Sequence, residues 1–310
     1  PWAGMKFAIL PKPKDEPIAA LEAEGHEHVG IDGNPDMILF GGGPDDFPDT
    51  LPDSVQVVQL MYAGVEALLE AGILAKHAEN GVRFANAGGL FDDTVAESAL
   101  ALLLAVEHRM KAVDREWNNR QIFKEKEYLF DGKKLALIGA GGIGKTLIRF
   151  LEPFGMEITA VNRSGNPVDG ADRTVAMKDA DNVWADNDYF VLITPLTDET
   201  RHMIDAERIA TMKDSAVVVN VGRGPLVDTQ ALTDALKNGT LRGAGLDVTE
   251  PEPLNDDHPL WDMDNCVITP HVANIPRFTL RRIGGLAATN WQQFAAGETM
   301  ATEVDVEAGY

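Results

Sequence analysis

Short apolar runs alternate with amphipathic stretches through the first ninety residues of the chain. Two stretches, near Pro17–Glu24 and Gly64–Ala71, have the mixed polar and apolar spacing of helices. The apolar runs are bounded by Gly, Pro or Asp, as buried parallel strands are. The expected strands are Met5–Leu10, Met37–Phe40, Val55–Gln59 and Val82–Ala85. This alternation predicts an α/β domain with a parallel sheet.

A longer apolar stretch follows, from Ser98 to Val106. Thr94 precedes it and Glu97 stands three residues later, which is the spacing of a capping box at the start of a helix. Because the helix after this box is apolar nearly all round, we expect it to be buried. The pattern fits a plain core helix and also a helix that joins two domains.

Residues 134–270 repeat the strand–helix alternation more clearly. The apolar runs are Lys134–Ile138, Glu157–Val161, Tyr189–Ile193, Ala216–Asn220, Ala244–Val248 and Val267–Thr269. Helix-compatible stretches separate them, and such a succession of βαβ units predicts a doubly wound parallel sheet. A further helix is expected over Thr279–Ala296, and the residues after it have the pattern of an extended tail.

The size and composition fit two globular domains. The chain has 310 residues, of which 45% are hydrophobic and 25% charged, and a domain typically takes ~150 residues. No apolar run reaches the ~18 residues that a transmembrane helix needs, and the first residues lack the basic start and apolar stretch of a signal peptide. The single cysteine, Cys266, excludes an intrachain disulfide and favours a reducing, cytoplasmic location.

The charge balance departs from the average. Lys plus Arg number 27 and Asp plus Glu 49, so the formal net charge is −22. This balance argues against binding to nucleic acid or to an anionic membrane, because either needs a basic patch. The carboxylates are dispersed along the chain rather than gathered in a tail. An ordinary acidic cytoplasmic protein fits this pattern, but we favour a halophilic protein, in which concentrated salt screens carboxylate repulsion.

A glycine-rich turn ends the first strand of the second half, with the sequence Gly139-Ala140-Gly141-Gly142-Ile143-Gly144. The pattern G-x-G-x-x-G alone is weak, but between a strand and a helix it indicates a dinucleotide-binding domain. Gly139 permits the tight turn, Gly141 lets the backbone approach a pyrophosphate, and Gly144 lets helix and strand pack closely. The diphosphate is expected at the helix N-terminus, where free N–H groups and the helix dipole favour an anion.

The end of the next strand indicates which dinucleotide binds. An Asp or Glu about 20 residues beyond the glycine turn bonds the ribose diol of NAD, but this chain has Asn162, Arg163 and Ser164 there. Arg163 can pair with a 2′-phosphate, and Asn162 and Ser164 can donate hydrogen bonds to it. We therefore predict a preference for NADP(H). The alternative is that Arg163 only stacks on adenine and that NAD(H) is used as well.

Three short motifs stand at the ends of later strands, where open α/β sheets bind ligands. They are Val219-Asn220-Val221-Gly222-Arg223-Gly224, Asp247-Val248-Thr249-Glu250-Pro251-Glu252-Pro253 and Thr269-Pro270-His271-Val272-Ala273. Further segments complete the pattern: Thr94–Glu97, Thr194-Pro195-Leu196-Thr197, Val304-Asp305 and Gly309-Tyr310. With these motifs, nearly the whole chain resembles the D-2-hydroxyacid dehydrogenase family of NAD(P)-dependent 2-keto acid reductases.

The resemblance implies that Arg223, Glu252 and His271 are catalytic. The planar guanidinium of Arg223 suits the carboxylate and carbonyl oxygens of a 2-keto acid. His271 can donate a proton to the developing alkoxide, because an imidazole exchanges its proton near neutral pH. Glu252, bonded to that imidazole, would favour its charged form. No spacing of His, Cys and carboxylates indicates a metal site. The histidines to which we assign no chemistry are His26, His28, His77, His108, His202 and His258.

By the same resemblance, Leu60-Met61-Tyr62-Ala63-Gly64-Val65 is the substrate loop. The N–H groups of Ala63 and Gly64 would hold the substrate carboxylate, and Met61 and Tyr62 would border the substrate side chain. The family commonly has Asp two residues after this glycine, where Glu66 stands here, so the local cap differs.

The resemblance also implies the cofactor contacts. Asn86–Gly89 would lie near the nicotinamide and Asp247 would hold its carboxamide. The expected cofactor-binding residues are Gly139, Gly141, Gly142, Ile143, Gly144, Asn162, Arg163, Ser164, Thr194, Pro195, Val221 and Asp247.

The family fold implies two Rossmann- and flavodoxin-like α/β domains with parallel sheets and an active site in the cleft between them. Residues 1–93 and 278–310 would form a discontinuous substrate domain, and residues 94–277 the dinucleotide-binding domain. Hinge closure would exclude water before hydride transfer. The family usually dimerises through the cofactor domain, so we expect a homodimer.

The sequence leaves the substrate open. The intact set of Arg, Glu and His favours reduction of a 2-keto acid over oxidation of formate or phosphite. Glyoxylate, hydroxypyruvate and longer 2-keto acids all fit, although Met61 and Tyr62 favour an apolar side chain. A dinucleotide-sensing binding protein is an alternative of another class, because transcriptional corepressors share this scaffold.

Overall fold

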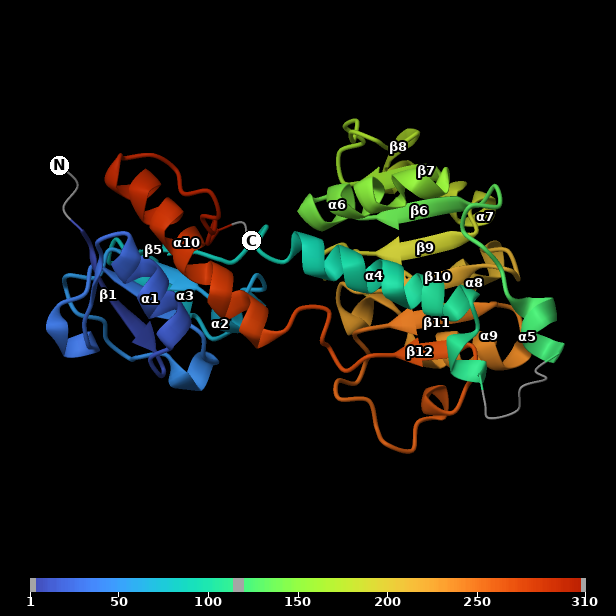
Figure 1. Ribbon diagram of the computed structural model, residues 1–310, viewed down its shortest axis with the longest axis horizontal. Coiled ribbons are helices and arrows are strands. Elements are labelled where there is room, and N and C mark those ends of the chain that lie inside the picture. The colour runs from blue at the N-terminus through green and yellow to red at the C-terminus, as the bar shows by residue number, and fades with distance from the viewer. Residues whose placement is uncertain (1–3, 114–119, 308–310) are drawn as a thin grey trace. The chain divides into compact units, whose positions relative to one another are not determined.

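The chain forms two compact units, each with its own parallel sheet (Figure 1). The computed structural model describes residues 4–113 and 120–307. The terminal unit comprises Pro1–Phe91 and Ile275–Tyr310, and the central unit comprises Asp92–Asn274. The first border, after Phe91, lies two residues before the expected one, and the second, before Ile275, lies three residues before the expected one. The motif Gly309-Tyr310 falls outside the described residues.

The terminal unit contains five parallel strands in the order β2-β1-β3-β4-β5. This is the flavodoxin-like order, in which a switch point lies between the first and third strands. The strands are β1 (Lys6–Leu10), β2 (Glu27–His28), β3 (Met37–Phe40), β4 (Val57–Leu60) and β5 (Arg83–Ala85). Only β2 had no apolar run to predict it, because it has two polar residues at the sheet edge.

Alternate residues of these strands point to opposite faces, and both faces are covered. Phe7 and Ile9 pack toward α1 (Asp15–Ala23) and α10 (Pro276–Ala295), which lie side by side (Figure 1). On the other face, Ala8 packs in one cluster with residues of α2 (Glu66–Glu70) and α3 (Ile73–Ala78). Burial on both faces explains why the strands read as continuous apolar runs.

The central unit contains seven parallel strands in the order β12-β11-β10-β9-β6-β7-β8. Numbered from β6, six of them follow the doubly wound order 3-2-1-4-5-6, with β12 added at the edge. The strands are β6 (Lys134–Ile138), β7 (Glu157–Asn162), β8 (Arg173–Ala176), β9 (Tyr189–Leu192), β10 (Val217–Asn220), β11 (Gly243–Leu246) and β12 (Cys266–Ile268). The two parallel-sheet α/β domains predicted from the sequence are confirmed.

Helices cover both faces of the central sheet. On one face α4 packs against α6 and against β10, β11 and β12, and on the other α7, α8 and α9 enclose the main apolar core (Figure 1). The helices are α4 (Asp92–Glu107), α5 (Arg120–Glu125), α6 (Gly142–Leu151), α7 (Val183–Asp186), α8 (Ala206–Thr211) and α9 (Thr229–Asn238). Across the described residues, no helix combines the length and apolarity that a membrane span requires.

The start of α4 corrects the predicted capping box. The helix begins at Asp92, so Thr94 lies inside its first turn and its hydroxyl donates to Asn274 Oδ1 at 3.3 Å. Asp92 and Asp93 place negative charge at the positive end of the helix, which favours the earlier start. The helix is not buried all round either, since Glu97 and Ala101 are exposed.

Candidate active site

Three neighbouring strands of the central sheet end in the loops that carry the predicted catalytic residues. Arg223 follows β10, Glu252 follows β11, and His271 follows β12. Because parallel strands run in one direction, the three loops lie at the same edge of the sheet. This carboxyl edge is where open α/β sheets bind ligands.

His271 and Glu252 form a hydrogen-bonded pair at this edge. The distance between His271 Nδ1 and Glu252 Oε1 is 2.5 Å, and the two side chains are 56% and 42% exposed, so a small molecule can reach them. A carboxylate at Nδ1 fixes the orientation of the imidazole and leaves Nε2 to exchange a proton. His271 has a φ of +52°. The structure thus brings together two of the three predicted catalytic residues.

Asp247 holds the loop that carries His271. Asp247 is 2% exposed, and its carboxylate accepts hydrogen bonds from Thr269 Oγ1 at 2.6 Å, Val272 N at 2.9 Å and Ala273 N at 3.0 Å. The N–H of His271 also donates to the Asp247 carbonyl at 2.8 Å. This structural role was not visible in the sequence, and the carboxamide contact of Asp247 stays a prediction.

A buried asparagine shapes the turn that carries Arg223. Asn220 is 0% exposed, its Nδ2 donates to the Arg223 carbonyl at 2.9 Å, and its Oδ1 accepts from Gly222 N at 3.1 Å. The Arg223 Nη1 donates to the Gly222 carbonyl at 3.0 Å. The backbone of this turn is therefore fixed by the last residue of β10. Val221, a predicted cofactor contact, is buried within the turn.

The glycine turn has the geometry of a dinucleotide-binding loop. Gly139 has a φ of +98°, and a Cβ there would lie 2.8 Å from Thr194 N at the end of the neighbouring strand β9. A Cβ on Gly144 would lie 2.9 Å from the Gly139 carbonyl oxygen. Helix α6 starts directly after Gly141, so its first N–H groups face the turn. The residues present therefore fit a dinucleotide diphosphate.

One feature of the turn was not predicted. A Cβ added to Gly142 would collide with the carboxylate of Asp92, so this carboxylate lies against the turn from the first turn of α4. Burial raises the pKa of Asp92, and the charge of Asp93 raises it further.

The end of β7 holds the residues that were expected to select the dinucleotide. Asn162 closes a local turn: its Oδ1 accepts from Gly165 N at 2.6 Å and its Nδ2 donates to the Asn166 carbonyl at 2.9 Å. The Ser164 hydroxyl accepts from Asn166 N at 3.2 Å. Arg163 is exposed between them. The turn thus occupies part of the hydrogen-bonding capacity predicted for Asn162 and Ser164.

The predicted substrate loop follows β4 in the terminal unit. The Tyr62 hydroxyl donates to the Gly42 carbonyl at 3.0 Å, and burial raises the pKa of Tyr62 to about 12. Asn86 Nδ2 donates to the Ala63 carbonyl at 3.1 Å. Within the part of the chain that the structure describes, neither Ala63 N nor Gly64 N donates to a protein acceptor. These N–H groups can therefore take a carboxylate.

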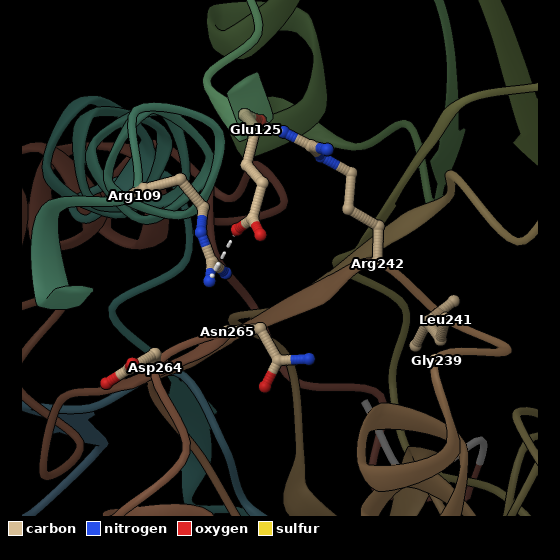
Figure 2. A pocket seen from close by; sticks show the side chains of 7 residues that line it. All are labelled: Arg109, Glu125, Gly239, Leu241, Arg242, Asp264 and Asn265. Carbon is tan, nitrogen blue, oxygen red and sulfur yellow. Dashed lines mark hydrogen bonds and ion pairs between the residues drawn. The ribbon is translucent and has the colours of Figure 1, made fainter. Parts of the chain in front are cut away.

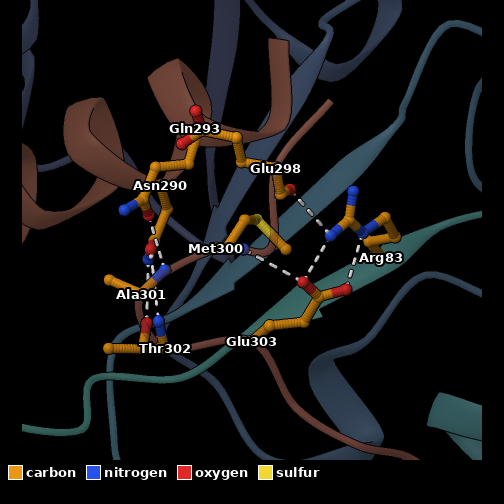
Figure 3. A network of polar contacts seen from close by, with 8 residues as sticks. All are labelled: Arg83, Asn290, Gln293, Glu298, Met300, Ala301, Thr302 and Glu303. Carbon is orange, nitrogen blue, oxygen red and sulfur yellow. Dashed lines mark hydrogen bonds and ion pairs between the residues drawn. The ribbon is translucent and has the colours of Figure 1, made fainter. Parts of the chain in front are cut away.

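A buried polar network holds the backbone of Asn86, and Figure 3 shows one of its contacts, between Asn290 and Thr302. Gln59 and Asn290 are both 0% exposed, and Asn290 Nδ2 donates to Gln59 Oε1 at 2.7 Å and to Thr302 Oγ1 at 2.8 Å. Gln59 Nε2 and Thr302 Oγ1 donate in turn to the Asn86 carbonyl at 2.8 Å and 2.6 Å. The last helix and the segment after it thus fix the residue that holds the substrate loop.

A cavity of about 290 Å³ lies at the opposite edge of the central sheet (Figure 2). Its lining includes residues directly before β11 and β12, which are the amino ends of these strands, and Arg109 Nη2 pairs with Glu125 Oε2 across it at 2.9 Å. The lining residues are Arg109, Glu125, Gly239, Leu241, Arg242, Asp264 and Asn265. None of them is a predicted site residue, so we do not place the reaction there.

Comparison with known proteins identifies the family. Residues 100–273 match the model of the D-isomer specific 2-hydroxyacid dehydrogenase, NAD binding domain. The chain belongs to this family. Its members are NAD(P)-dependent oxidoreductases that act on the CH–OH group of 2-hydroxy acids, and the predicted enzyme class is confirmed.

Individual relatives cover most of the chain. An uncharacterised protein of Corynebacterium melassecola is 50% identical over 309 residues, 99% of this chain and 100% of the relative. A glyoxylate reductase of Thermococcus kodakarensis is 34% identical over 236 residues, 73% of this chain and 71% of the relative. The crystal structure of a D-isomer specific 2-hydroxyacid dehydrogenase from Xanthobacter autotrophicus Py2, in complex with NADPH and MES, has a TM-score of 0.82 at 25% identity and covers 99% of this chain and 100% of that chain.

Proposed function

We propose that this dehydrogenase is an NADP(H)-preferring reductase of small 2-keto acids, with His271 as proton donor, Glu252 as its partner and Arg223 as the substrate-binding cation. The hydrogen bond of 2.5 Å between His271 and Glu252, at the carboxyl edge beside the Arg223 turn, carries this proposal. The bound dinucleotide supplies the hydride that reduces the keto carbon.

The chain's own residues manage the proton and the negative charges. Glu252 at Nδ1 orients the imidazole, and Nε2 of His271 gives its proton to the oxygen that becomes an alkoxide. Arg223 binds the carboxylate and the carbonyl oxygen with its planar fork. The N–H groups of Ala63 and Gly64 hold the substrate carboxylate, which keeps the keto acid in one orientation.

The preference for NADP(H) rests on the end of β7. Arg163 is exposed there beside Asn162 and Ser164, and no carboxylate stands at this strand end to repel a 2′-phosphate. The Xanthobacter relative, which was crystallised with NADPH, adds support. The remaining alternative is that NAD(H) is also used.

The substrate is proposed to be glyoxylate or hydroxypyruvate, and the Thermococcus glyoxylate reductase supports a small 2-keto acid. Longer 2-keto acids are the alternative that Met61 and Tyr62 favour. We also propose a homodimer formed through the central unit, where Phe123 and Phe130 are 86% and 66% exposed. The molar mass in solution, measured by light scattering, tests the dimer.

The activity is tested by following absorbance at 340 nm with NADPH or NADH and glyoxylate, hydroxypyruvate, pyruvate or 2-ketohexanoate. We expect oxidation of NADPH in preference to NADH. The variant His271→Asn should lower kcat by about 10²- to 10⁴-fold, because general acid catalysis is lost, while NADPH binding measured by fluorescence is retained. His28→Asn, on the edge strand β2, is the matched control and should turn over normally. Unchanged turnover in His271→Asn would remove His271 from the mechanism.

A further inference from the structure

Glu250, on the loop that carries Glu252, forms a second histidine–glutamate pair, with His202 from the segment between β9 and α8. His202 Nε2 is 2.5 Å from Glu250 Oε2, and Arg201 Nη1 donates to Glu250 Oε1 at 3.0 Å. Glu250 stands two residues before Glu252 in the segment between β11 and β12. Neither His202 nor Glu250 belongs to the catalytic set proposed above.

The backbone of His202 is bonded to the other catalytic loop. Its N–H donates to the Pro225 carbonyl at 2.8 Å, and Pro225 stands two residues after Arg223. Two residues later, Ile204 forms a parallel β-bridge with Val227, which follows the Arg223 turn. His202 has a φ of +51°, a conformation that costs free energy for a residue with a side chain. One residue therefore binds the Arg223 loop through its backbone and the Glu252 loop through its side chain.

The two loops also contact each other directly. A Cβ on Gly224 would collide with the Thr249 carbonyl, so the residue after Arg223 lies against the start of the loop that bears Glu252. The Glu250 carbonyl accepts a hydrogen bond from Thr229 Oγ1 at 2.6 Å. Glu250 is thus held at its carbonyl and at both of its carboxylate oxygens.

This arrangement restricts where Glu252 can lie. Glu252 and His271 are both about half exposed, so their own surroundings hold them weakly. The ion-pair partners of Glu250 are Arg201 and His202, and that of Glu252 is His271. Fixing Glu250 fixes the short backbone segment from which the Glu252 side chain extends toward the imidazole.

We propose that His202, acting through Glu250, is a positioning residue that sets the distance between Arg223 and the His271–Glu252 pair. The inference rests on the catalytic roles proposed for these three residues. His202 touches no reacting atom in this account. It acts by holding two loops that come from strands β10 and β11 in a single arrangement.

The variants are chosen to preserve the backbone conformation at positions 202 and 250. Asn tolerates a positive φ better than other residues but is too short to reach Glu250, so His202→Asn removes the side-chain contact and spares the turn. Glu250→Ala removes the other half of the pair. Glu250→Gln is the conservative variant, because its amide can still accept from Arg201 and donate to a neutral imidazole. Lys134→Gln removes an exposed ion pair with Glu157 at the amino ends of β6 and β7 and is the matched control.

The measurement is kcat/KM for the best 2-keto acid against pH, together with NADPH affinity and melting temperature. His202→Asn and Glu250→Ala should each lower kcat/KM by about 10- to 100-fold, as a shift of the order of an ångström does. The double variant should be no worse than either single one, since both break the same link. The dependence of kcat/KM on pH should differ from that of the wild type in these variants, because the His271–Glu252 pair is displaced, whereas in Lys134→Gln it should stay the same. Glu250→Gln should keep at least about a third of the wild-type kcat/KM, which corresponds to a loss of transition-state stabilisation of less than ~1 kcal/mol.

A purely structural role predicts another result. If His202→Asn lowers the melting temperature but leaves the pH profile and kcat/KM as in Lys134→Gln, the positioning role is wrong. Additive losses in the double variant would contradict it as well. The His271→Asn result separates the two proposals: if that variant turns over normally, the proposed function fails, whereas an inactive His271→Asn beside a fully active His202→Asn overturns only the positioning role.

Discussion

Asp92 shows how one carboxylate can act on the cofactor turn. Because it lies against Gly142, its negative charge opposes that of a diphosphate. Two unit charges about 4 Å apart repel by ~1 kcal/mol even in water. We therefore expect Asp92→Asn to lower the Kd for NADPH by about five-fold at neutral pH, as measured by NADPH fluorescence without substrate.

The affinity for NADPH should also depend on pH through the protonation of Asp92. Burial and Asp93 raise the pKa of Asp92, so as the pH falls its carboxylate becomes neutral earlier than an ordinary one. Wild-type affinity should then rise toward that of Asp92→Asn, which lacks this group. Asp93→Asn removes an equal charge, but from an exposed carboxylate that pairs with Arg149 at 3.3 Å, and should change the Kd by less than about two-fold. Equal effects of the two variants would mean that only net charge matters.

The sequence predicted those residues whose type the chemistry itself requires. A dinucleotide turn needs glycine at Gly139 and Gly144, and the proposed chemistry needs a cation and an acid–base group such as Arg223 and His271. The supporting residues could not be predicted in the same way. His202 meets Glu250 across 48 positions of sequence, and a lone histidine carries no signal of such a contact.

At the scale of elements, the apolar strands were predictable, including β5 and β12 at the sheet edges, and the polar edge strands β2 and β8 were not. The runs at β6 and β3 coincide with the strands because both faces of each sheet are covered and every position after Lys134 in β6, and every position of β3, is apolar. The edge strands β2 and β8 contain polar residues and are partly exposed, so periodicity does not reveal them. The predicted start of α4 at a Thr94 capping box was wrong, because Asp92 and Asp93 stabilise a start of the helix two residues earlier.

An ion pair between Arg83 and Glu303 (Figure 3), together with a backbone hydrogen bond, fixes the segment after α10 to the edge strand β5. Arg83 Nε donates to Glu303 Oε1 at 2.6 Å, its Nη2 contacts Glu303 Oε2, and Val304 N donates to the Phe84 carbonyl at 2.8 Å. The hydrogen bond with Arg83 is the main reason that the pKa of Glu303 lies below its ordinary value. The sequence indicated an extended tail here but not the partner that holds it.

The lowered pKa of Glu303 has a definite consequence for stability. A carboxyl group with a lower pKa in the folded state stabilises the fold above its unfolded pKa, and this contribution is lost as the pH falls through the folded pKa. Glu303→Gln should therefore lower the free energy of unfolding by ~1–3 kcal/mol near neutral pH, and by less at about pH 3–4. Chemical denaturation at several pH values measures this.

Glu307→Gln is the control for that experiment. It removes the same charge from the same segment, at an exposed position, and should change the free energy of unfolding by less than ~0.5 kcal/mol throughout. A constant difference between wild type and Glu303→Gln down to pH 3 would show that the carboxylate charge is not what holds this segment.

At the scale of the whole molecule, the formal net charge of −22 is the dominant electrostatic feature. Ion pairs relieve little of it, because pairs such as Lys134–Glu157 are themselves exposed and contribute only about 0–1 kcal/mol. Mutual repulsion among the remaining carboxylates destabilises the compact state. Salt acts on this repulsion directly, since the Debye length falls from ~10 Å at 0.1 M to ~3 Å at 1 M.

We therefore expect the melting temperature to rise by several degrees between 0.1 M and 3 M KCl, with most of the rise below about 1 M, where the Debye length changes most. Salting-out of apolar surface would also stabilise the fold, but it keeps growing with salt concentration and does not depend on carboxylate ionisation.

The two causes can be distinguished near the isoelectric point of about 4.6, where the net charge vanishes. If screening is the cause, the rise should shrink there, whereas salting-out should persist. Equal melting temperatures at 0.1 M and 3 M KCl at neutral pH would contradict adaptation to salt, and an equal rise at both pH values would assign the effect to the apolar surface instead of the carboxylates.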